Sequence, residues 1–175
     1  DEPILLAVQR LQTGWLDTVV SVLTMFGDAV VAFPLMGLVI LGLILARRRV
    51  DALAVAATMI VMVVGHALKT PVGRPRPEHF IAGADASGFG FPSGHTVIAL
   101  LFGGILIVLA NDLIRPFRVR RGVQIGLGVL ALAIGFSRMY LGVHWPSDVI
   151  GAYLFAGVSL AVVLALRNTL LSKGW

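Results

Sequence analysis

Residues 92–111 read PSGHTVIALLFGGILIVLAN, a short polar motif that runs directly into an apolar segment. The apolar part, 95–111, is close to the length that an α-helix needs to cross the hydrocarbon core of a bilayer. Further runs of the same character are 29–46, 52–68, 123–140 and 148–166. Helices satisfy their backbone polar groups internally, so they are the expected spanning structure. The sequence therefore predicts an all-α, polytopic membrane helical bundle with five clear spans.

The composition agrees with a membrane protein. Of the 175 residues, 58% are hydrophobic and 13% are charged, which is about half the charged fraction of a soluble domain. The length predicts a single domain, 1–175. The absence of cysteine excludes disulfides and thiolate chemistry. The net charge is +5, but the basic residues lie mostly in short loops between apolar runs, so we expect no nucleic-acid partner.

The N-terminal segment, 1–27, is less regular than the five runs. Leucines and valines recur at near-helical spacing, but polar residues such as Arg10 and Asp17 interrupt them. We predict an amphipathic helix lying in the membrane interface, with a sixth, imperfect span as the alternative. The sequence begins with Asp rather than Met, so an upstream span or signal sequence that has been removed is also an open alternative.

Positive charge is distributed unevenly over the loops. If the five spans alternate, nine of the fourteen Lys and Arg residues fall on one side, in the loops at 47–49 and 115–121 and in the C-terminal tail. Positive loops mark the cytoplasmic face. The same alternation brings 69–94 and 138–147 together on the opposite face. We therefore expect a multi-pass protein of the plasma (inner) membrane whose polar motifs face the periplasm or the cell exterior.

The first polar motif, KTPVGRPRP at 69–77, follows the 52–68 run. Lys69, Arg74 and Arg76 are suited to binding phosphate, arginine through a planar fork and lysine as a point charge. The prolines restrict φ and stiffen the segment, which fixes the angles at which the arginines are presented. Any one of these cations alone is more simply explained as an interfacial residue. The set favours an anion site.

Pro92, Ser93, Gly94 and His95 form the second motif, at the start of a span. Ser93 is a favourable N-cap whose hydroxyl can also donate to a phosphate oxygen, and Gly94 lets the backbone approach an anion closely. The free N–H groups and the dipole of a helix N-terminus attract negative charge. His95 can donate a proton to a leaving oxygen. The alternative is an ordinary helix cap with an incidental interfacial histidine.

The third motif comprises Ser137 and Arg138, followed by His144 and Asp148. At this spacing near a helix start, Asp148 can accept a hydrogen bond from one imidazole nitrogen, which leaves the other as a free lone pair. His144 is therefore a candidate nucleophile. Without such a partner, a histidine next to Trp145 is more often an interfacial residue.

Other polar residues give weaker indications. His66, one turn before Lys69, could support the site but is more simply explained as locally satisfied within its span. Asp28 is predicted to cap a helix. The 78–91 loop is expected to face water or the substrate and to shape substrate access; the residues of interest are Glu78, His79, Phe80, Ile81, Asp85, Phe89 and Phe91.

In order and spacing, these motifs closely resemble the three signature motifs of the type 2 phosphatidic acid phosphatase (PAP2) superfamily. The matching residues are Lys69, then Arg76 and Pro77 after six residues; Pro92 to His95; and Ser137, Arg138, His144 and Asp148. The superfamily contains integral-membrane lipid phosphatases, glucose-6-phosphatase and vanadium haloperoxidases. The motifs cover 69–148, and the helical pattern extends the resemblance over most of the chain, implying a PAP2/haloperoxidase-like core with 69–94 as the catalytic-side loop.

The resemblance implies a role for each matching residue. His144 would be the nucleophile that becomes phosphohistidine, Asp148 its orienting partner, and His95 the acid that protonates the leaving alcohol and then activates water. Arg74 lies outside the strict signature and is only a further candidate phosphate ligand. The resemblance to the family's phosphatases implies that no metal is needed, so we expect no cofactor, and the sequence has no carboxylate cluster suited to magnesium. The implied phosphate ligands are Lys69, Arg76, Ser93, Gly94 and Arg138.

The expected activity is that of a metal-independent phosphatase acting on a phosphomonoester or pyrophosphate of an anionic lipid in the bilayer. Undecaprenyl pyrophosphate, phosphatidylglycerophosphate, phosphatidic acid and a lipid A phosphate all fit, and the oligomeric state is open. A lipid phosphotransferase with the same site is one alternative. A non-enzymatic lipid-phosphate binder or transporter is another, but it would need a polar pathway, and only His66 lies deep in a span. Vanadate-dependent peroxidases share the scaffold, but those relatives are soluble.

Overall fold

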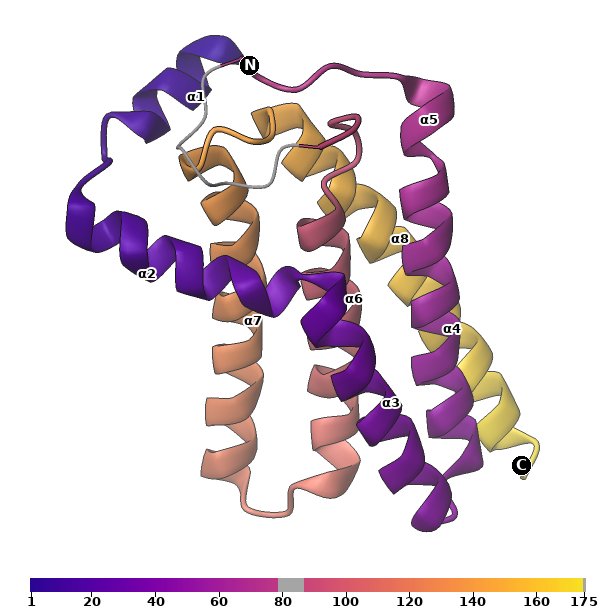
Figure 1. Ribbon diagram of the computed structural model, residues 1–175. Helices are drawn as coiled ribbons and strands as arrows, with labels where there is room; N and C mark the ends of the chain where they lie inside the picture. The colour runs from indigo at the N-terminus through magenta and orange to yellow at the C-terminus, as the bar shows by residue number, and fades with distance from the viewer. Residues whose placement is uncertain (79–86, 175) are drawn as a thin grey trace.

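The computed structural model describes residues 1–78 and 87–174, and all of its regular elements within those ranges are helical (Figure 1). The all-α prediction is confirmed. The elements are α1 (Glu2–Gln9), α2 (Gly14–Thr24), the 3₁₀ turn η1 (Met25–Gly27), α3 (Ala29–Leu45), α4 (Arg49–Ala67), α5 (Lys69–Val72), α6 (Gly94–Leu113), α7 (Phe117–Tyr140) and α8 (Pro146–Ser172).

The long helices form a bundle in which α6 packs against α4, α7 and α8 (Figure 1). By length and composition, α4 continued by α5, α6, α7 and α8 can each cross a membrane. The fifth predicted span corresponds to α3, which has 17 residues. It reaches spanning length only together with α2 and η1, as a pair of helices bent by 47°.

Several helix ends differ from the sequence prediction. α7 begins at Phe117, so Arg118, Arg120 and Arg121 lie in its first turns rather than in a loop. Arginine is a good helix former, and Pro116 stands at the N-cap, where a missing N–H costs nothing. The predicted catalytic-side loop is likewise shorter, because α5 continues α4 before Gly73 ends it with φ of +62°.

The N-terminal helices α1 and α2 lie across one end of the bundle (Figure 1). α2 packs against α7 through buried Val20 and exposes Trp15. The hydroxyl of Tyr140 donates to Asp17 Oδ1 at 2.7 Å, which fixes α2 on the end of α7. As predicted, Asp28 caps the next helix by accepting from the N–H of Val30 at 2.9 Å.

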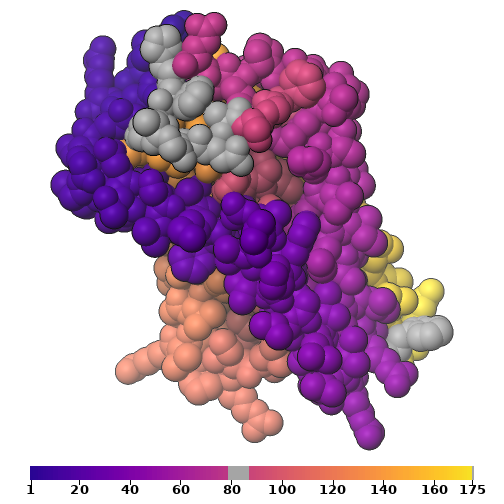
Figure 2. Space-filling view, viewed as in Figure 1, coloured from indigo at the N-terminus to yellow at the C-terminus, as the bar shows by residue number. Residues whose placement is uncertain are grey.

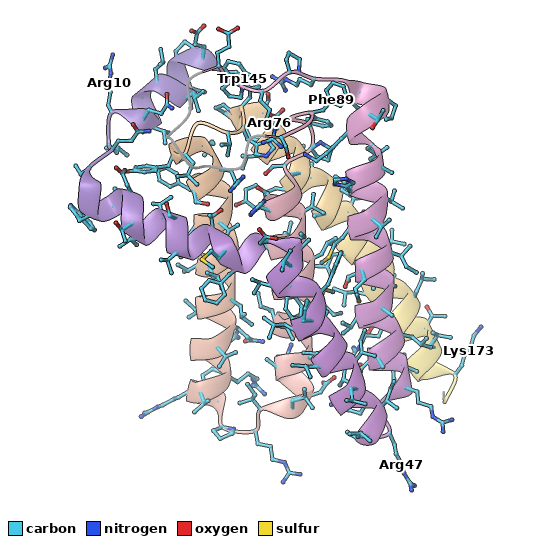
Figure 3. All side chains as sticks on the ribbon, viewed as in Figure 1. Arg10, Arg47, Arg76, Phe89, Trp145 and Lys173 are labelled. Carbon is cyan, nitrogen blue, oxygen red and sulfur yellow. The ribbon has the colours of Figure 1, made fainter. Side chains whose placement is uncertain are left out.

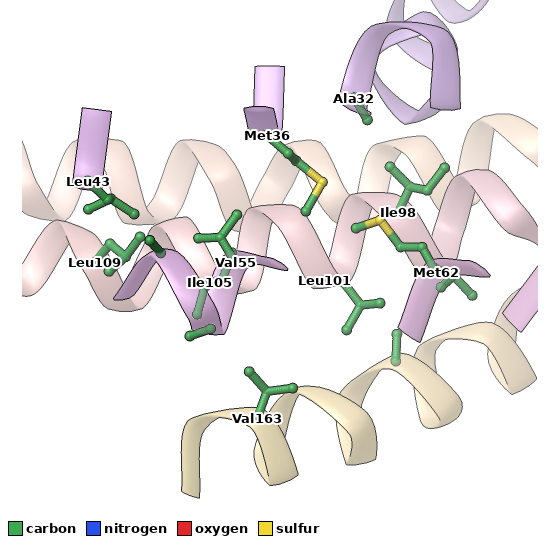
Figure 4. Close-up of a cluster of buried hydrophobic side chains, with 14 of the residues drawn as sticks. Ala32, Met36, Leu43, Val55, Met62, Ile98, Leu101, Ile105, Leu109 and Val163 are labelled. Carbon is green, nitrogen blue, oxygen red and sulfur yellow. The ribbon is translucent and has the colours of Figure 1, made fainter. Parts of the chain in front are cut away.

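The core lies between α3, α4, α6 and α8 (Figure 4). Met36, Val55, Leu101 and Ile105 have no exposed surface there. Elsewhere glycines let helices approach closely. A Cβ on Gly135 of α7, for example, would lie 2.0 Å from the hydroxyl of Tyr153 on α8. Small residues allow such close contact between helices in membrane bundles. Close packing matters there because helices in lipid are not driven together by the hydrophobic effect.

A partly buried ion network lies at one end of the bundle. Asp51 on α4 accepts from Arg167 on α8 at 2.6 Å and from Arg48 at 2.5 Å. Asp112 on α6 accepts from the same two arginines at 2.7 and 2.8 Å. Figure 3 places Arg47 and Lys173 at this end, whereas Arg76, Phe89 and Trp145 lie at the opposite end. The predicted separation of the basic loops from the polar motifs is therefore present in the fold.

Candidate active site

The polar motifs meet in one cavity of about 620 Å³ at the end of the bundle opposite the ion network. It lies among α4, α6, α7 and the segment before α8. Of the predicted site residues, the following line it: Lys69, Arg76, Gly94, His95, Arg138 and His144. Residues separated by more than seventy positions in the sequence thus share one solvent-accessible space.

The first motif contributes two cations whose side chains are held by backbone carbonyls. Arg76 donates to the carbonyls of Ser87, Gly88 and Val143 at 2.8, 3.0 and 3.0 Å. Lys69 donates to the carbonyl of Phe89 at 3.0 Å. These acceptors orient the cations without cancelling their charge, and they tie the segment after α5 to the residues just before α6.

The second motif begins α6, with one difference from the predicted geometry. Ser93 occupies the N-cap position, but its side chain makes no capping hydrogen bond. Instead its buried hydroxyl accepts from Thr96 Oγ1 at 2.9 Å. The competing hydroxyl one turn along the helix explains why the cap is absent.

Arg138 stands on the last turn of α7 and is 3% exposed. Its Nη1 donates to Thr24 Oγ1 at 2.9 Å, so the N-terminal segment supports the site. The chain then turns through Gly142, with φ of +73°. This turn lets the N–H of His144 donate to the carbonyl of Arg138 at 3.3 Å. The guanidinium and the imidazole are thereby held on the same turn.

His144 and Asp148 form a buried pair. Nδ1 of His144 is 3.5 Å from Oδ2 of Asp148, a distance that needs to shorten for a strong hydrogen bond. The same oxygen accepts from the N–H of Trp145 at 3.0 Å. On the other side of the ring, Nε2 lies 3.3 Å from Nη1 of Arg76. One ring nitrogen thus faces a carboxylate, as predicted, and the other lies beside the guanidinium of Arg76.

Burial lowers the pKa of His144 from 6.5 to about 4. Asp148 opposes this effect, while the nearby charges of Arg76, Arg138 and Lys69 add to it. A histidine in this environment is neutral at physiological pH and keeps a lone pair on the nitrogen away from the carboxylate. That is the form an attacking imidazole needs.

Arg74, the further candidate phosphate ligand, does not line the cavity, and neither do Ser93 and Asp148. Its Nη1 lies 3.0 Å from Oδ1 of Asp148 and donates to Ser147 Oγ at 2.6 Å. Its Nη2 donates to Asp1 Oδ2 at 2.6 Å. Pro75 separates Arg74 from Arg76, and the two guanidinium groups lie on opposite sides of the pair formed by His144 and Asp148.

The structure also adds residues that the motifs did not indicate. Gly90 lies against the catalytic carboxylate, since a Cβ there would be 2.9 Å from Asp148 Oδ2. Ser147, Asp1 and Thr24 contact the arginines of the site. No pattern in the sequence marks these positions, because each contact depends on how distant segments pack.

The weaker candidates divide into two groups. His66 and Phe89 line the cavity, whereas Glu78 is exposed and does not line it. Phe91 packs against Gly151 of α8 rather than opening into the cavity. His79, Phe80, Ile81 and Asp85 lie outside the described residues. Across 1–78 and 87–174, no cluster of His, Asp and Glu is arranged to hold a metal ion.

Fold and site together define an integral-membrane enzyme that acts on a phosphate group. The chain belongs to the PAP2 superfamily, which it matches over residues 51–171. It is 31% identical over 160 residues to phosphatidylglycerophosphatase B of Bacillus subtilis, covering 87% of this chain and 76% of that protein. It is 28% identical over 150 residues to an undecaprenyl-diphosphatase of Sulfolobus acidocaldarius, covering 82% of this chain and 66% of that protein.

A solved structure agrees with these sequence relations. The crystal structure of a transmembrane PAP2-type phosphatidylglycerolphosphate phosphatase from Bacillus subtilis superposes with a TM-score of 0.82 at 27% identity, covering 96% of this chain and 84% of that one. The chain is therefore a membrane phosphatase of the lipid-phosphatase type, a hydrolase of phosphoric ester bonds.

Proposed function

We propose that this chain removes phosphate from a phosphomonoester or diphosphate of an anionic lipid through a phosphohistidine formed at His144. The observation that carries the proposal is the surroundings of this one side chain. His144 is neutral, lies against Asp148 on one side and faces Arg76 on the other. The names of the relatives, a phosphatidylglycerophosphatase and an undecaprenyl-diphosphatase, support both kinds of lipid head group as substrates.

A second cavity supports a lipid as the carrier of the phosphate. It has a volume of about 300 Å³, is almost entirely apolar and lies between α3, α4 and α6. It shares Ala29, His66, Gly94 and Ile98 with the polar cavity, so the two spaces adjoin. Val63 on its wall is 59% exposed on the outside of the bundle. A lipid can thus place its phosphate among the cations while its first chain carbons remain in apolar surroundings.

The reaction follows from these positions in two steps. Nε2 of His144 attacks phosphorus in line, the bond from phosphorus to the lipid oxygen breaks, and His95 gives its proton to that oxygen. Water then attacks the phosphohistidine as His95 takes its proton, the N–P bond breaks, and inorganic phosphate leaves. Lys69, Arg76 and Arg138, with Ser93 and the amide of Gly94, stabilise the charge on the equatorial oxygens, the main source of catalysis in this chemistry.

Phosphate release from four lipids in detergent micelles tests the proposal: phosphatidic acid, phosphatidylglycerophosphate, undecaprenyl pyrophosphate and lipid A. The wild-type protein should release inorganic phosphate without an acceptor lipid, and acid-labile radiolabel should accumulate on it during turnover. His144→Ala should lose both signals while remaining folded and able to bind phosphate. Near-normal activity of that variant would reject the nucleophile. Transfer of label only to an added lipid would indicate a phosphotransferase.

The proposed orientation places this site outside the plasma membrane, because the basic ends of α3, α4, α6 and α7 lie at the opposite end. The absence of cysteine makes the orientation easy to test. In intact cells, a membrane-impermeant maleimide should label Ser87→Cys at the catalytic end but not Ser172→Cys at the other. Labelling of Ser172→Cys alone would reverse the orientation.

A further inference from the structure

Arg74 lies behind the catalytic pair rather than in the cavity. Its Nη1 is 3.0 Å from Oδ1 of Asp148, a side chain with no exposed surface. The other oxygen of that carboxylate, Oδ2, faces Nδ1 of His144 at 3.5 Å. Asp148 therefore bridges an arginine and a histidine, with one oxygen turned to each.

The guanidinium of Arg74 is itself held in place. Ser147 Oγ accepts from Nη1 and Asp1 Oδ2 accepts from Nη2, each at 2.6 Å. Asp1 also accepts from the N–H and the hydroxyl of Ser147 at 2.9 and 2.6 Å. Figure 2 shows the indigo N-terminal residues at the same end of the molecule as the magenta segment that follows α5. The N-terminal residue and the start of α8 thus fix the side chain together.

The backbone around Arg74 is equally constrained. Its carbonyl accepts from the N–H of Gly90 at 2.8 Å. The next carbonyl, that of Pro75, accepts from the indole N–H of Trp145 at 3.1 Å. Both partners also lie against Asp148: Gly90 through its Cα, and Trp145 through its backbone N–H at 3.0 Å. Arg74 and Asp148 are therefore parts of one tightly packed unit.

A buried carboxylate is costly unless a cation compensates it. Here the cation approaches Oδ1 and leaves Oδ2 directed at the imidazole. We infer that Arg74 is a positioning residue for phosphoryl transfer, which acts through Asp148 on His144 and does not bind the phosphate. This inference rests on the proposed function of the site.

The role has a chemical consequence. When Nε2 bonds to phosphorus, the imidazole ring of His144 becomes positively charged, and only an ionised Asp148 stabilises it. Without Arg74, the buried site around His144 holds one cation fewer, so a proton on the imidazole costs less and the pKa of His144 rises. The fraction of enzyme in the reactive form then falls at mildly acidic pH, and the charged intermediate loses its partner.

The experiment compares Arg74→Gln and Arg74→Lys with two other variants of the full chain. Arg76→Gln removes a proposed phosphate ligand, and Arg10→Gln removes an exposed arginine at the same end of the molecule. Each is assayed with dioctanoyl phosphatidic acid in micelles for kcat, KM and the pH dependence of kcat/KM, and for inhibition by inorganic phosphate. The substrate ionises in the same way in every assay. Differences between the pH profiles of the variants therefore reflect ionisation of groups on the enzyme.

For Arg74→Gln we expect kcat to fall by about tenfold or more and the acid limb of kcat/KM to move up by about one pH unit. Inhibition by phosphate should stay within about threefold of wild type. Arg74→Lys should restore most of the pH profile because it keeps the charge. Arg76→Gln should instead weaken inhibition by phosphate, and Arg10→Gln should resemble wild type.

Two results would overturn the inference. One is a weakening of phosphate inhibition in Arg74→Gln like that in Arg76→Gln. The other is an unchanged pH profile of Arg74→Gln accompanied only by a loss of thermal stability.

If Arg74→Gln does not fold, Ser147→Ala provides the same test, because it removes a partner of Nη1 of Arg74 while keeping the cation. It should shift the acid limb in the same direction by a smaller amount, and an unchanged profile would count against the inference. A wild-type protein that releases no phosphate would reject the proposed function instead.

Discussion

Gly90→Ala tests how finely the catalytic carboxylate is positioned. The added Cβ would lie 2.9 Å from Oδ2 of Asp148, whereas ordinary contact begins near 3.4 Å, so the atoms must separate by about 0.5 Å. Gly90 cannot easily retreat, because its N–H donates to the carbonyl of Arg74 at 2.8 Å. The displaced oxygen is the one that faces Nδ1 of His144 at 3.5 Å and accepts from Trp145 at 3.0 Å.

A displacement of about 1 Å in an active site can lower the rate by a factor of about 10². A displacement of about 0.5 Å should therefore lower kcat by about tenfold, which corresponds to ~1.4 kcal/mol of activation free energy. Phosphate release from phosphatidic acid, measured beside thermal unfolding in detergent, separates this effect from misfolding. Gly126→Ala is the matched control, because a Cβ there meets nothing within 4 Å. A Gly90→Ala variant with kcat within twofold of wild type would show that Asp148 is not held by this contact.

The remaining predictions concern the protonation of His144, the ion network and the cavity wall. The folded-state pKa of His144, about 4, lies below its ordinary 6.5, so the neutral ring should persist to mildly acidic pH and folding stability should fall as the pH drops from 6.5 towards 4. NMR of isotope-labelled histidine checks this, and a midpoint near 6.5 would contradict it. Asp51→Ala should cost about 3 kcal/mol of stability, because Arg167 stays buried with one carboxylate fewer. Thermal unfolding in detergent measures that loss, and activity per folded molecule should be unchanged. His66→Ala should raise KM for long-chain lipids more than for short-chain ones, because His66 lines both cavities. An equal change in KM for both would argue against a role at their junction.

Much of the site was predictable because its residues are fixed by short-range geometry and by topology. The four-residue spacing of His144 and Asp148 at a helix start brings them together whatever the rest of the bundle does. Alternation of apolar spans puts Lys69 and Arg138 on one face. Neither inference needs the packing of one helix against another, which a single sequence does not reveal.

The other features depend on that packing. Gly90 matters because it meets Asp148 across 58 positions of sequence, and Thr24 matters because η1 and α2 place it beside Arg138. The missing side-chain cap at Ser93 reflects competition from Thr96, one turn away. The position of Arg74 depends on packing as well. A stiff, proline-flanked segment indicates that its side chains have definite directions, but not which side of the catalytic pair each one faces.

The arginines at the two ends of the bundle have different surroundings in the described part of the chain. At the end with the ion network, Arg48 and Arg167 share two carboxylates with each other, so charge is satisfied within the protein. At the other end, Arg76 is oriented by three backbone carbonyls, which are neutral acceptors. Arg74 lies between these cases, because its guanidinium is 3.0 Å from Oδ1 of Asp148 and is also held by Ser147 and Asp1. In the proposed mechanism, the charge directed at the phosphate and the charge directed at the pair of His144 and Asp148 therefore come from separate arginines, two residues apart.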